Sequence, residues 1–380
     1  IPHKKAVIPL LDEIDTAARD LHSVNTVRFA DGKATGFNTD ILGFAESLNR
    51  DGVSLQGKKV LLLGYGGAAS VMAYHCVTQG AYLTITGRNL EKAEALQKQL
   101  TDAVPGARIS VFSRRHIPRD IHIVLNSTPV GMYPNVGVSA LDITSMPGLE
   151  AVIDVIYNPD KTELILRAEE LGVPVAVGGL EMLVAQAVYA AEFFLDRKFE
   201  DAGAEIARVT SELRREQLNI ALIGMPSSGK STLGRALAER LGKRFVDLDE
   251  EIVKADGRSI PDIFAAEGEA GFRKLEAAQS ARFARENRQV ISCGGGVVKD
   301  PANLRALHAN GIVLFIDRPL EDLLVGGGRP LSTSPEALKT MEAQRRPLYL
   351  AAADAVIPNK TTPADAVTAA MEALDEIFSH

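Results

Sequence analysis

The chain has 380 residues, of which 46% are hydrophobic and 24% charged, and its formal net charge is −7. This composition excludes collagen-like, disulfide-rich and mainly disordered proteins, and the acidic balance argues against a broad surface for nucleic acid. The two cysteines, Cys76 and Cys293, fit a reducing cytosol. No apolar run reaches the roughly 20 residues that cross a bilayer. We therefore expect a cytoplasmic protein of about two or three domains.

The first informative element is an apolar strand pattern over residues 58–63, followed by a glycine-rich turn and a helical pattern. A strand, a glycine turn and a helix open a doubly wound parallel sheet, and the glycines let a dinucleotide approach the backbone. We expect five residues of the turn to bind such a cofactor: Gly64, Tyr65, Gly66, Gly67 and Ala68.

The next predicted strand, residues 82–86, indicates which dinucleotide binds. An NAD-dependent enzyme normally places an acid after this strand to bind the ribose 2′-hydroxyl. This chain has Arg88 and Lys92 there instead. Two cations suit a 2′-phosphate, so the sequence predicts NADP.

A polar stretch over residues 196–217 carries interspersed acidic and basic side chains. Mixed charges at helical spacing are typical of a solvated helix face. We expect a charged helical linker over residues 198–218 that separates two domains.

The segment after this linker predicts a nucleoside triphosphate site. Residues 219–223 form an apolar strand pattern, and GMPSSGKST follows, which fits G-x-x-x-x-G-K-[ST] from Gly224 to Ser231. Such a loop wraps backbone N–H groups around phosphates, while its lysine adds a positive charge and its hydroxyl reaches Mg²⁺. The residues expected to bind the nucleotide are Gly224, Ser228, Gly229, Lys230, Ser231 and Thr232.

Two carboxylates, Asp247 and Asp249, are expected at the end of the next strand. Alternation along a strand would send them to different faces, so that they can serve different roles. One can hold Mg²⁺ through water, for which we expect Asp247 beside Ser231. The other can accept a proton from an attacking hydroxyl.

Four further motifs follow: GFRKLE at residues 271–276, CGGG at 293–296, GRPL at 328–331 and RRPLY at 345–349. In this order, after the phosphate loop and the Asp-x-Asp pair, they resemble the shikimate kinase family. Gluconate kinase is the nearest alternative, but GFRKLE followed by CGGG favours shikimate.

The resemblance implies that shikimate is bound by Asp249, Arg273, Gly295 and Arg345, with the two arginines on its carboxylate. It also implies Asp249 as the general base and Arg329 as a lid arginine that stabilises the transferring phosphoryl group. Many relatives carry an adenine-stacking arginine before the lid, where this chain has apolar and glycine residues at 323–328. Apolar contact and Lys360 would then hold the adenine.

The first half carries its own set of motifs: PHK at residues 2–4, VNT at 24–26, NTD at 38–40, NSTPVGM at 126–132, DVIYNP at 154–159 and GGLEMLVAQ at 178–186. In sequence and order these resemble the shikimate dehydrogenase family. Ile41 stands where that family usually has glycine.

This second resemblance implies a Lys4–Asp40 pair at the reacting carbon, with Lys4 transferring the proton. It further implies that Asn25, Tyr157 and Gln186, with Asp40, bind the substrate, and that Val155, Gly179 and Met182 lie near the nicotinamide. The family carries further residues ahead of Lys4, including a Ser-x-Ser site for the substrate carboxylate. We expect the 380-residue chain to bind NADP and phosphorylate shikimate, and to need those residues for efficient reduction.

Together these patterns predict an α/β chain in which a Rossmann-type NADP-binding domain precedes a P-loop kinase domain with a parallel sheet. The expected limits are 1–50 for a remnant of the dehydrogenase substrate domain, 51–197 for the NADP-binding domain with its C-terminal helices, and 219–380 for the kinase domain. The predicted function is reduction of 3-dehydroshikimate with NADPH and phosphorylation of the resulting shikimate with ATP.

Two alternatives remain open at this point. In the first, only the kinase is active, and the other half is an incomplete NADP-binding piece of a larger protein. In the second, both halves sense nucleotides without turnover, although a sensor would not need the bases Lys4 and Asp249. The oligomeric state is not predicted.

Overall fold

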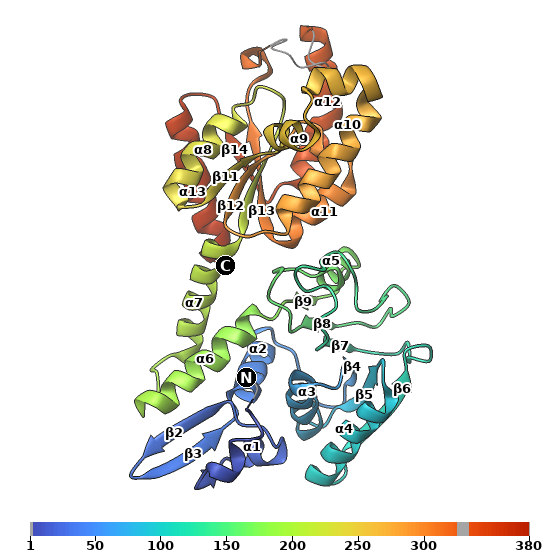
Figure 1. Cartoon of the computed structure of the whole chain (residues 1–380), viewed down its shortest axis with the longest axis vertical. Helices are drawn as coiled ribbons and strands as arrows, with labels where there is room; N and C mark the ends of the chain where they lie inside the picture. Colours follow the sequence, from blue (N-terminus) through green and yellow to red (C-terminus); the bar gives the residue numbers. More distant parts are fainter. Residues whose placement is uncertain (1–2, 325–333, 380) are drawn as a thin grey trace. The chain divides into compact units, whose positions relative to one another are not determined.

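The computed structural model describes residues 3–324 and 334–379. The chain forms two compact units, Ile1–Thr210 and Ser211–His380 (Figure 1). Helix α7 (Ala202–Gln217) begins in the first unit and ends in the second. The helical stretch predicted from residue 196 therefore starts later, because Asp196 has a φ of 47° and ends the preceding helix in the left-handed region.

The first unit is built on a six-stranded parallel sheet with the order β6-β5-β4-β7-β8-β9. The strands predicted at residues 58–63 and 82–86 are confirmed as β4 and β5. The strands are β4 (Lys59–Leu63), β5 (Tyr82–Gly87), β6 (Arg108–Ser113), β7 (Ile123–Asn126), β8 (Ala151–Asp154) and β9 (Val175–Val177). The helices are α1 (Thr16–Asp20), α2 (Thr39–Arg50), α3 (Gly67–Thr78), α4 (Leu90–Ala103), α5 (Glu163–Glu170) and α6 (Leu180–Leu195), with a 3₁₀ turn at Ile8–Leu10.

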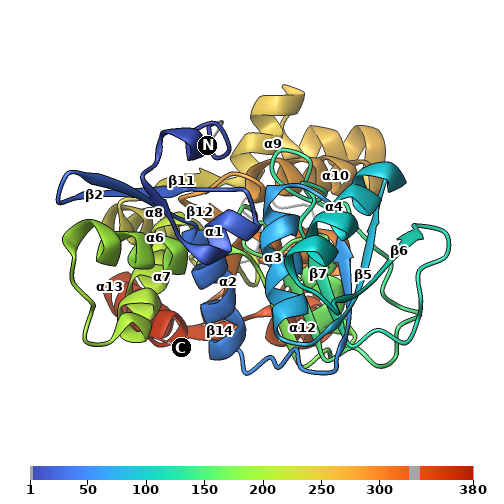
Figure 2. The same cartoon turned by 90° about the horizontal axis from the view of Figure 1, so that it is seen from below.

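Alternating residues of the central strand β4 face two different cores. Val60 and Leu62 pack in one core, which α3 and α4 cover (Figure 2). Leu61 and Leu63 pack in the other, which α5 covers. A strand buried on both faces has no polar alternation, which explains the continuous apolar run at this position.

A smaller three-stranded sheet, with the order β1-β3-β2, precedes the large sheet in the chain; its strands are β1 (Glu13–Ile14), β2 (Thr26–Ala30) and β3 (Lys33–Phe37). Strands β2 and β3 form a hairpin whose two-residue turn, Asp31–Gly32, has positive φ at both positions. The hairpin places the residues before β2 beside those after β3.

Helices α2 and α6 pack closely because Gly43 has no side chain. A Cβ at this position would lie 2.6 Å from the carbonyl oxygen of Met182 and 2.8 Å from the backbone nitrogen of Gln186. The close approach brings the N-terminal half of α6 to the end of the hairpin.

The second unit contains a five-stranded parallel sheet with the order β11-β12-β10-β13-β14. The predicted strand over residues 219–223 is confirmed as β10. The strands are β10 (Asn219–Ile223), β11 (Arg244–Asp247), β12 (Gln289–Ser292), β13 (Gly311–Asp317) and β14 (Ala355–Pro358). The helices are α8 (Lys230–Leu241), α9 (Leu248–Asp256), α10 (Ile260–Ala284), α11 (Pro301–Ala309), α12 (Pro335–Ala352) and α13 (Pro363–Ser379), with 3₁₀ turns at Val297–Lys299 and Leu320–Asp322.

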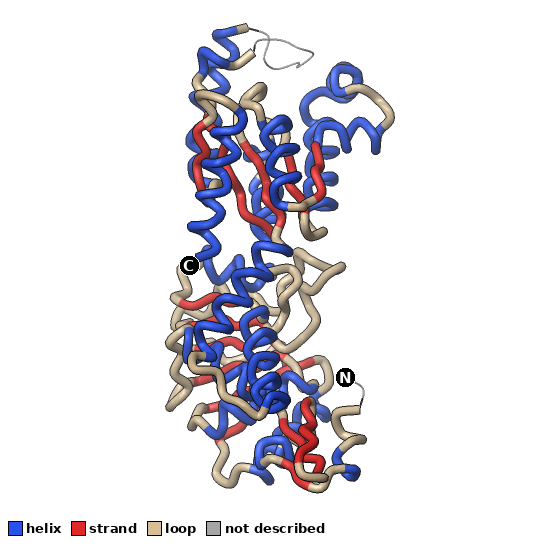
Figure 3. Tube along the Cα trace, turned by 90° about the vertical axis from the view of Figure 1, so that its left-hand side faces the viewer, coloured by secondary structure: helices blue, strands red, loops and turns tan. Residues whose placement is uncertain are grey.

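The strands of this unit form a layer between helices (Figure 3). Ile220 and Leu222 of β10 pack with residues of α8 and α13. Ala221 and Ile223 pack on the other face with residues of α10, α11 and α12. Each of the two large sheets thus has helices on both faces, which is the α/β architecture that the sequence predicts. Within the described ranges, no helix combines the length and apolarity needed to span a membrane.

Candidate functional sites

The phosphate loop lies where the sequence predicts it, between β10 and α8. A Cβ on Gly224 would lie 2.6 Å from the carbonyl oxygen of Ile316, so only glycine fits beside β13. Gly229 follows with a φ of 90° and caps α8. The Nζ of Lys230 donates to the carbonyl oxygens of Gly224, at 2.9 Å, and Met225, at 2.8 Å. The lysine charge is therefore held within the loop, at a helix N-terminus that favours anions.

Ser231 and Asp247 meet beside this loop. The Ser231 hydroxyl donates to Oδ2 of Asp247 over 2.6 Å, and Ser292 lies 3.2 Å from the same hydroxyl. A hydroxyl and a carboxylate are oxygen ligands of the kind that Mg²⁺ takes. The described residues hold no cluster of three or more acidic, His or Cys ligands, so an ion here would take its other ligands from phosphate and water.

Asp247 and Asp249 lie in two different elements, which the sequence analysis did not predict. Strand β11 ends at Asp247, and Asp249 lies in the first turn of α9. The reason is local: Oδ1 of Asp247 accepts from the backbone N–H groups of Asp249, at 3.1 Å, and Glu250, at 3.4 Å. This N-cap starts the helix early, and residues two positions apart in a strand share a face in any case, so the expectation that strand alternation separates the pair is wrong.

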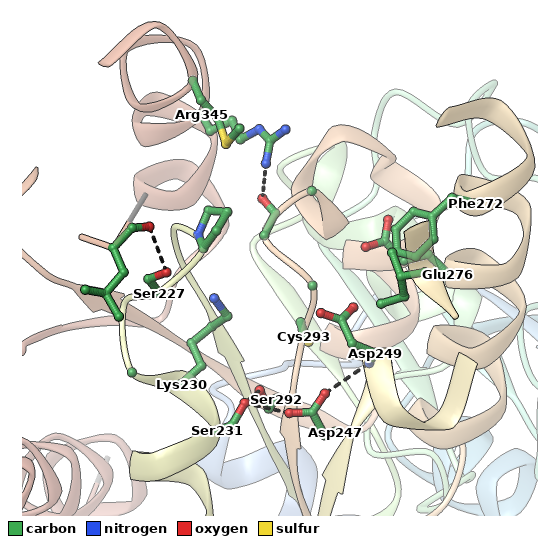
Figure 4. A pocket seen from close by; sticks show the side chains of 18 of the residues that line it. Ser227, Lys230, Ser231, Asp247, Asp249, Phe272, Glu276, Ser292, Cys293 and Arg345 are labelled. Atoms are coloured by element: carbon green, nitrogen blue, oxygen red, sulfur yellow. Dashed lines mark hydrogen bonds between the residues drawn. The ribbon is translucent and has the colours of Figure 1, made fainter. Parts of the chain in front are cut away.

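A cavity of about 420 Å³ contains both the phosphate loop and the residues expected to bind the acceptor. Lys230 and Ser231 line it from the loop side, and Asp249 lines it from the side of α9 and α10 (Figure 4). Arg273 and Arg345 also line it. A carboxylate, two guanidinium groups and a phosphate cradle thus share one space.

Arg345 is buried and donates to the carbonyl oxygen of Gly295 over 3.0 Å. The hydroxyl of Tyr349 donates to the same oxygen. Gly295 therefore acts by fixing α12 against the CGGG segment, a contact that motif matching alone does not predict. Arg329, the expected lid arginine, lies outside the described residues.

Glu276, the last residue of GFRKLE, is a site residue to which the sequence patterns give no role. Its Oε2 accepts from Nη1 of Arg273 over 2.6 Å, and only 1% of its side chain is exposed. Its Oε1 is buried without a hydrogen-bond partner among the described residues, 2.6 Å from where a Cβ of Gly294 would lie. Burial raises the pKa of this carboxyl, and the nearby charge of Asp249 raises it further. The signal in the sequence is the three-residue spacing from Arg273, which puts both on one helix face.

In the first unit, the hairpin gathers the predicted catalytic residues around Asp40. Its Oδ2 accepts from Nζ of Lys4 over 2.7 Å, and its Oδ1 accepts from Nδ2 of Asn25 over 2.9 Å. Asn25 in turn accepts the backbone N–H of Thr39 at 2.8 Å, and Thr39 donates its hydroxyl to Oε1 of Gln186 at 3.3 Å. Lys4, Asn25, Asp40 and Gln186 therefore form one connected polar group on partly exposed side chains.

The glycine turn follows β4 as expected, with Gly64 at a φ of 114° and Gly66 as the N-cap of α3. Gly67 and Ala68 form the first turn of that helix, and Tyr65 packs over Gly87. These positions leave the backbone at the helix N-terminus open to a ligand.

Arg88 and Lys92 lie just beyond β5, and both are exposed. Neither side chain forms an ion pair with another residue in the described part of the chain. Two uncompensated cations at the end of this strand can therefore bind an anionic ligand.

The residues expected near the nicotinamide follow the carboxyl ends of β8 and β9: Val155 comes directly after β8, Gly179 is the N-cap of α6, and Met182 lies in the first turn of that helix. A Cβ on Gly179 would collide with the carbonyl oxygen of Val155, so these two segments are in close contact. Val155 and Tyr157 line a cavity of about 400 Å³ with Ser127 and Thr128. Tyr157 is 54% exposed, and among the described residues it forms no hydrogen bond with the group around Asp40; Met182 packs partly into the core.

A fully buried carboxylate, Asp154, lies next to this cavity; it is the first residue of DVIYNP, and the sequence patterns give it no role. It accepts from Asn126 at 3.0 Å, Thr162 at 2.8 Å and the backbone N–H of Ile156 at 3.0 Å. Burial raises its pKa to about 6. Three donors from separate segments thus hold the ends of β7 and β8 together.

Comparisons with known proteins agree with these two sites. A family model described as shikimate kinase matches residues 226–375, and one described as shikimate / quinate 5-dehydrogenase matches residues 46–130. The shikimate dehydrogenase (NADP(+)) of Carboxydothermus hydrogenoformans is 38% identical over 194 residues, which are 50% of this chain and 69% of that protein. The shikimate kinase of Symbiobacterium thermophilum is 44% identical over 170 residues, 42% of this chain and 97% of that protein.

A chorismate mutase/shikimate 5-dehydrogenase fusion protein from Clostridium acetobutylicum has a similar fold, with a TM-score of 0.50, 32% identity and coverage of 56% of this chain and 76% of that chain. The two sites define a pair of fused α/β enzymes of the shikimate pathway. The chain belongs to the shikimate dehydrogenase family through its first part and to the shikimate kinase family through its second. NADP and ATP are the nucleotides of these families.

Proposed function

We propose that the chain catalyses two consecutive reactions at the two sites described above. The first site reduces 3-dehydroshikimate to shikimate with NADPH, and the second phosphorylates shikimate with ATP. The observation that supports this proposal is that each site brings a group able to transfer a proton close to polar groups able to bind a hydroxylated acid: Lys4 with Asn25 and Gln186, and Asp249 with Arg273.

In the proposed reduction, the substrate carbonyl lies at the Lys4–Asp40 pair. NADPH would supply the hydride to the carbonyl carbon. The Lys4 ammonium donates a proton to the carbonyl oxygen, and Asp40 holds that ammonium in position through the 2.7 Å ion pair. Asn25 and Gln186 would orient the hydroxyl groups. Tyr157 would bind the substrate from the neighbouring cavity.

The cofactor site extends from the glycine turn to the cavity around Val155. Gly64 to Ala68 would bind the pyrophosphate, and Arg88 with Lys92 would bind the 2′-phosphate of NADP. Val155, Gly179 and Met182 would lie at the nicotinamide. The order of β4, β5 and β7 in the sheet supports this placement of the cofactor, because ligands bind beyond the carboxyl ends of such parallel strands.

In the proposed phosphorylation, Asp249 removes the proton from the attacking hydroxyl of shikimate. Lys230 and the N–H groups of the loop stabilise charge on the phosphates. Arg273 and Arg345 bind the shikimate carboxylate, and Glu276 keeps Arg273 in place through its 2.6 Å hydrogen bond. Ser231 and Asp247 would hold Mg²⁺, which supplies positive charge to the phosphates when bound.

We further propose residues 51–197 as the NADP-binding domain and 219–380 as the kinase domain, joined by residues 198–218. Residues 1–50 would form the part that contributes Lys4, Asn25 and Asp40.

The test uses the natural full-length product of the coding sequence in two separate assays. Absorbance decay of NADPH with 3-dehydroshikimate measures the reduction, and ADP release with shikimate measures the phosphorylation. Both reactions are expected from one preparation. Absence of either removes the corresponding half of the proposal.

A further inference from the structure

One cation that lines the kinase cavity, Arg318, has no role in the reactions proposed above. Arg318 follows directly after β13 and lines the cavity together with Gly229, Ser227 and Leu324. A Cβ on Gly229 would lie 3.9 Å from Nη1 of Arg318 and 2.7 Å from Nδ2 of Asn359. The guanidinium group therefore reaches the last turn of the phosphate loop.

Arg318 has no protein partner for its charge within residues 3–324 and 334–379. Its Nε is buried and donates to none of the described residues. The neighbouring carboxylate of Asp317 is already occupied, because it accepts from both Nη1 and Nη2 of Arg346, at 2.6 and 2.8 Å. A buried donor without an acceptor is costly, which points to a ligand at this position.

The position favours the nucleotide over shikimate. The groups proposed to bind shikimate, Asp249, Arg273 and Arg345, come from α9, α10 and α12, whereas Arg318 lies at the phosphate loop. Leu324 is 72% exposed, lines the same cavity, and accepts a hydrogen bond from the Ser227 hydroxyl at 3.2 Å. An apolar side chain and a planar guanidinium group beside one loop suit an aromatic base.

We propose that Arg318 is a nucleotide-binding residue of the kinase site and that its guanidinium group stacks on the base of ATP. This inference rests on the kinase function proposed above. Lys230 and the loop hold the phosphates, so Arg318 determines affinity for the nucleoside end alone.

The first test measures ADP binding by titration calorimetry, which does not depend on turnover. Arg318→Ala should weaken ADP binding about five- to tenfold, the effect of losing a partly desolvated cation–π contact, and leave inorganic tripolyphosphate binding unchanged. Arg318→Lys should recover only part of the loss, since an ammonium is not planar. Arg240→Ala, an exposed arginine of α8 outside the cavity, is the matched control and should bind ADP like the parent.

The second test is steady-state kinetics with the same variants. Arg318→Ala should raise KM for ATP and leave KM for shikimate and kcat nearly unchanged. Parental ADP affinity in Arg318→Ala, equal weakening of tripolyphosphate, or a rise confined to KM for shikimate would each overturn the proposal. Arg318→Gln replaces Arg318→Ala if the alanine variant has a lower melting temperature. A parent protein that binds ADP and does not phosphorylate shikimate would refute the kinase function and leave the Arg318 contact standing.

Discussion

Lys4 and Asp40 are 36 residues apart in the sequence, and Nζ of Lys4 lies 2.7 Å from Oδ2 of Asp40. The second oxygen of Asp40 accepts from Asn25, so both oxygens of this carboxylate have a donor. The backbone carbonyl of Lys4 also accepts from the N–H of Val24 at 2.9 Å, which ties the lysine segment to the hairpin. These contacts therefore hold the Lys4 side chain beside Asp40, as the proton-donor role proposed above requires.

Replacing this donor should stop the reduction selectively. Lys4→Met should lower kcat for 3-dehydroshikimate reduction by about 10²-fold or more, the usual contribution of a general acid. NADPH binding, measured by the fluorescence of the cofactor, should stay at the parental value. Lys5→Met, which removes an exposed neighbouring lysine, serves as the control. Parental turnover in Lys4→Met would remove Lys4 from the mechanism.

Cofactor choice should follow the charge after β5. Each charge-assisted contact to the 2′-phosphate contributes about 1.5–3 kcal/mol, so the parent should bind NADP at least about tenfold more tightly than NAD. Arg88→Asp should erase or reverse this preference through repulsion. Lys98→Asp changes an exposed lysine further along α4 and should keep it. Titration calorimetry with NADP and with NAD measures the two affinities. Equal affinities in the parent would refute the proposed preference for NADP.

The kinase base can be tested by a change that keeps the size of the side chain. Asp249→Asn should lower kcat for shikimate-dependent ADP release by about 10²-fold or more and leave ADP affinity close to that of the parent. The control is Glu250→Gln, because Glu250 lies next in α9 and forms an exposed ion pair with Arg235 at 2.7 Å. Unchanged turnover in Asp249→Asn would show that another group accepts the proton.

The raised pKa of the buried Asp154 carboxyl predicts how the stability of the first unit depends on pH. Burial raises its folded-state pKa from 3.8 to about 6, so in this window the folded state holds the proton more tightly than the unfolded state. The contribution of Asp154 to stability therefore falls as pH rises from about 4 to about 6 and is constant above that. Asp154→Asn should remove this slope and also lower stability, because its amide group meets the donors of Asn126 and Thr162.

The measurement is chemical unfolding at several pH values, following the transition that added NADP shifts, which identifies the first unit. Asp142→Asn is the control: this exposed carboxyl has a lowered pKa because Thr144 donates to it, so its loss leaves the slope between pH 4 and 6 in place. A slope that persists in Asp154→Asn would assign the pH dependence to another group.

The fold and the nucleotide-binding residues follow from local sequence patterns, whereas most catalytic and substrate-binding candidates come from the resemblance to two families. The strand before each glycine loop is apolar after its first residue because it is buried on both faces, and β4 and β10 lie where this pattern predicts. The end of β11 was less predictable, because Asp247 caps α9 instead of continuing the strand. The capping role had a signal in the sequence, because Glu250 stands three positions after Asp247 and acidic residues fill the first turn of the helix.

Glu276 and Asp154 show what local patterns miss. Glu276 becomes a positioning group only when α10 packs against the CGGG segment and the side chain is buried beside Arg273. Asp154 gains its role from Asn126 and Thr162, which come from other parts of the chain. Burial and hydrogen bonds of this kind are properties of tertiary packing.

Under the proposed function, one chain carries two separate sites for consecutive steps. The most direct measurement supplies 3-dehydroshikimate, NADPH and MgATP to the natural full-length protein and follows shikimate and shikimate 3-phosphate over time. We expect the parent to form shikimate 3-phosphate and Asp249→Asn to accumulate shikimate. Lys4→Met should form shikimate 3-phosphate efficiently only when shikimate itself is added. Shikimate 3-phosphate formed from 3-dehydroshikimate by Lys4→Met at the parental rate, or none formed from shikimate by the parent, would contradict the proposed function.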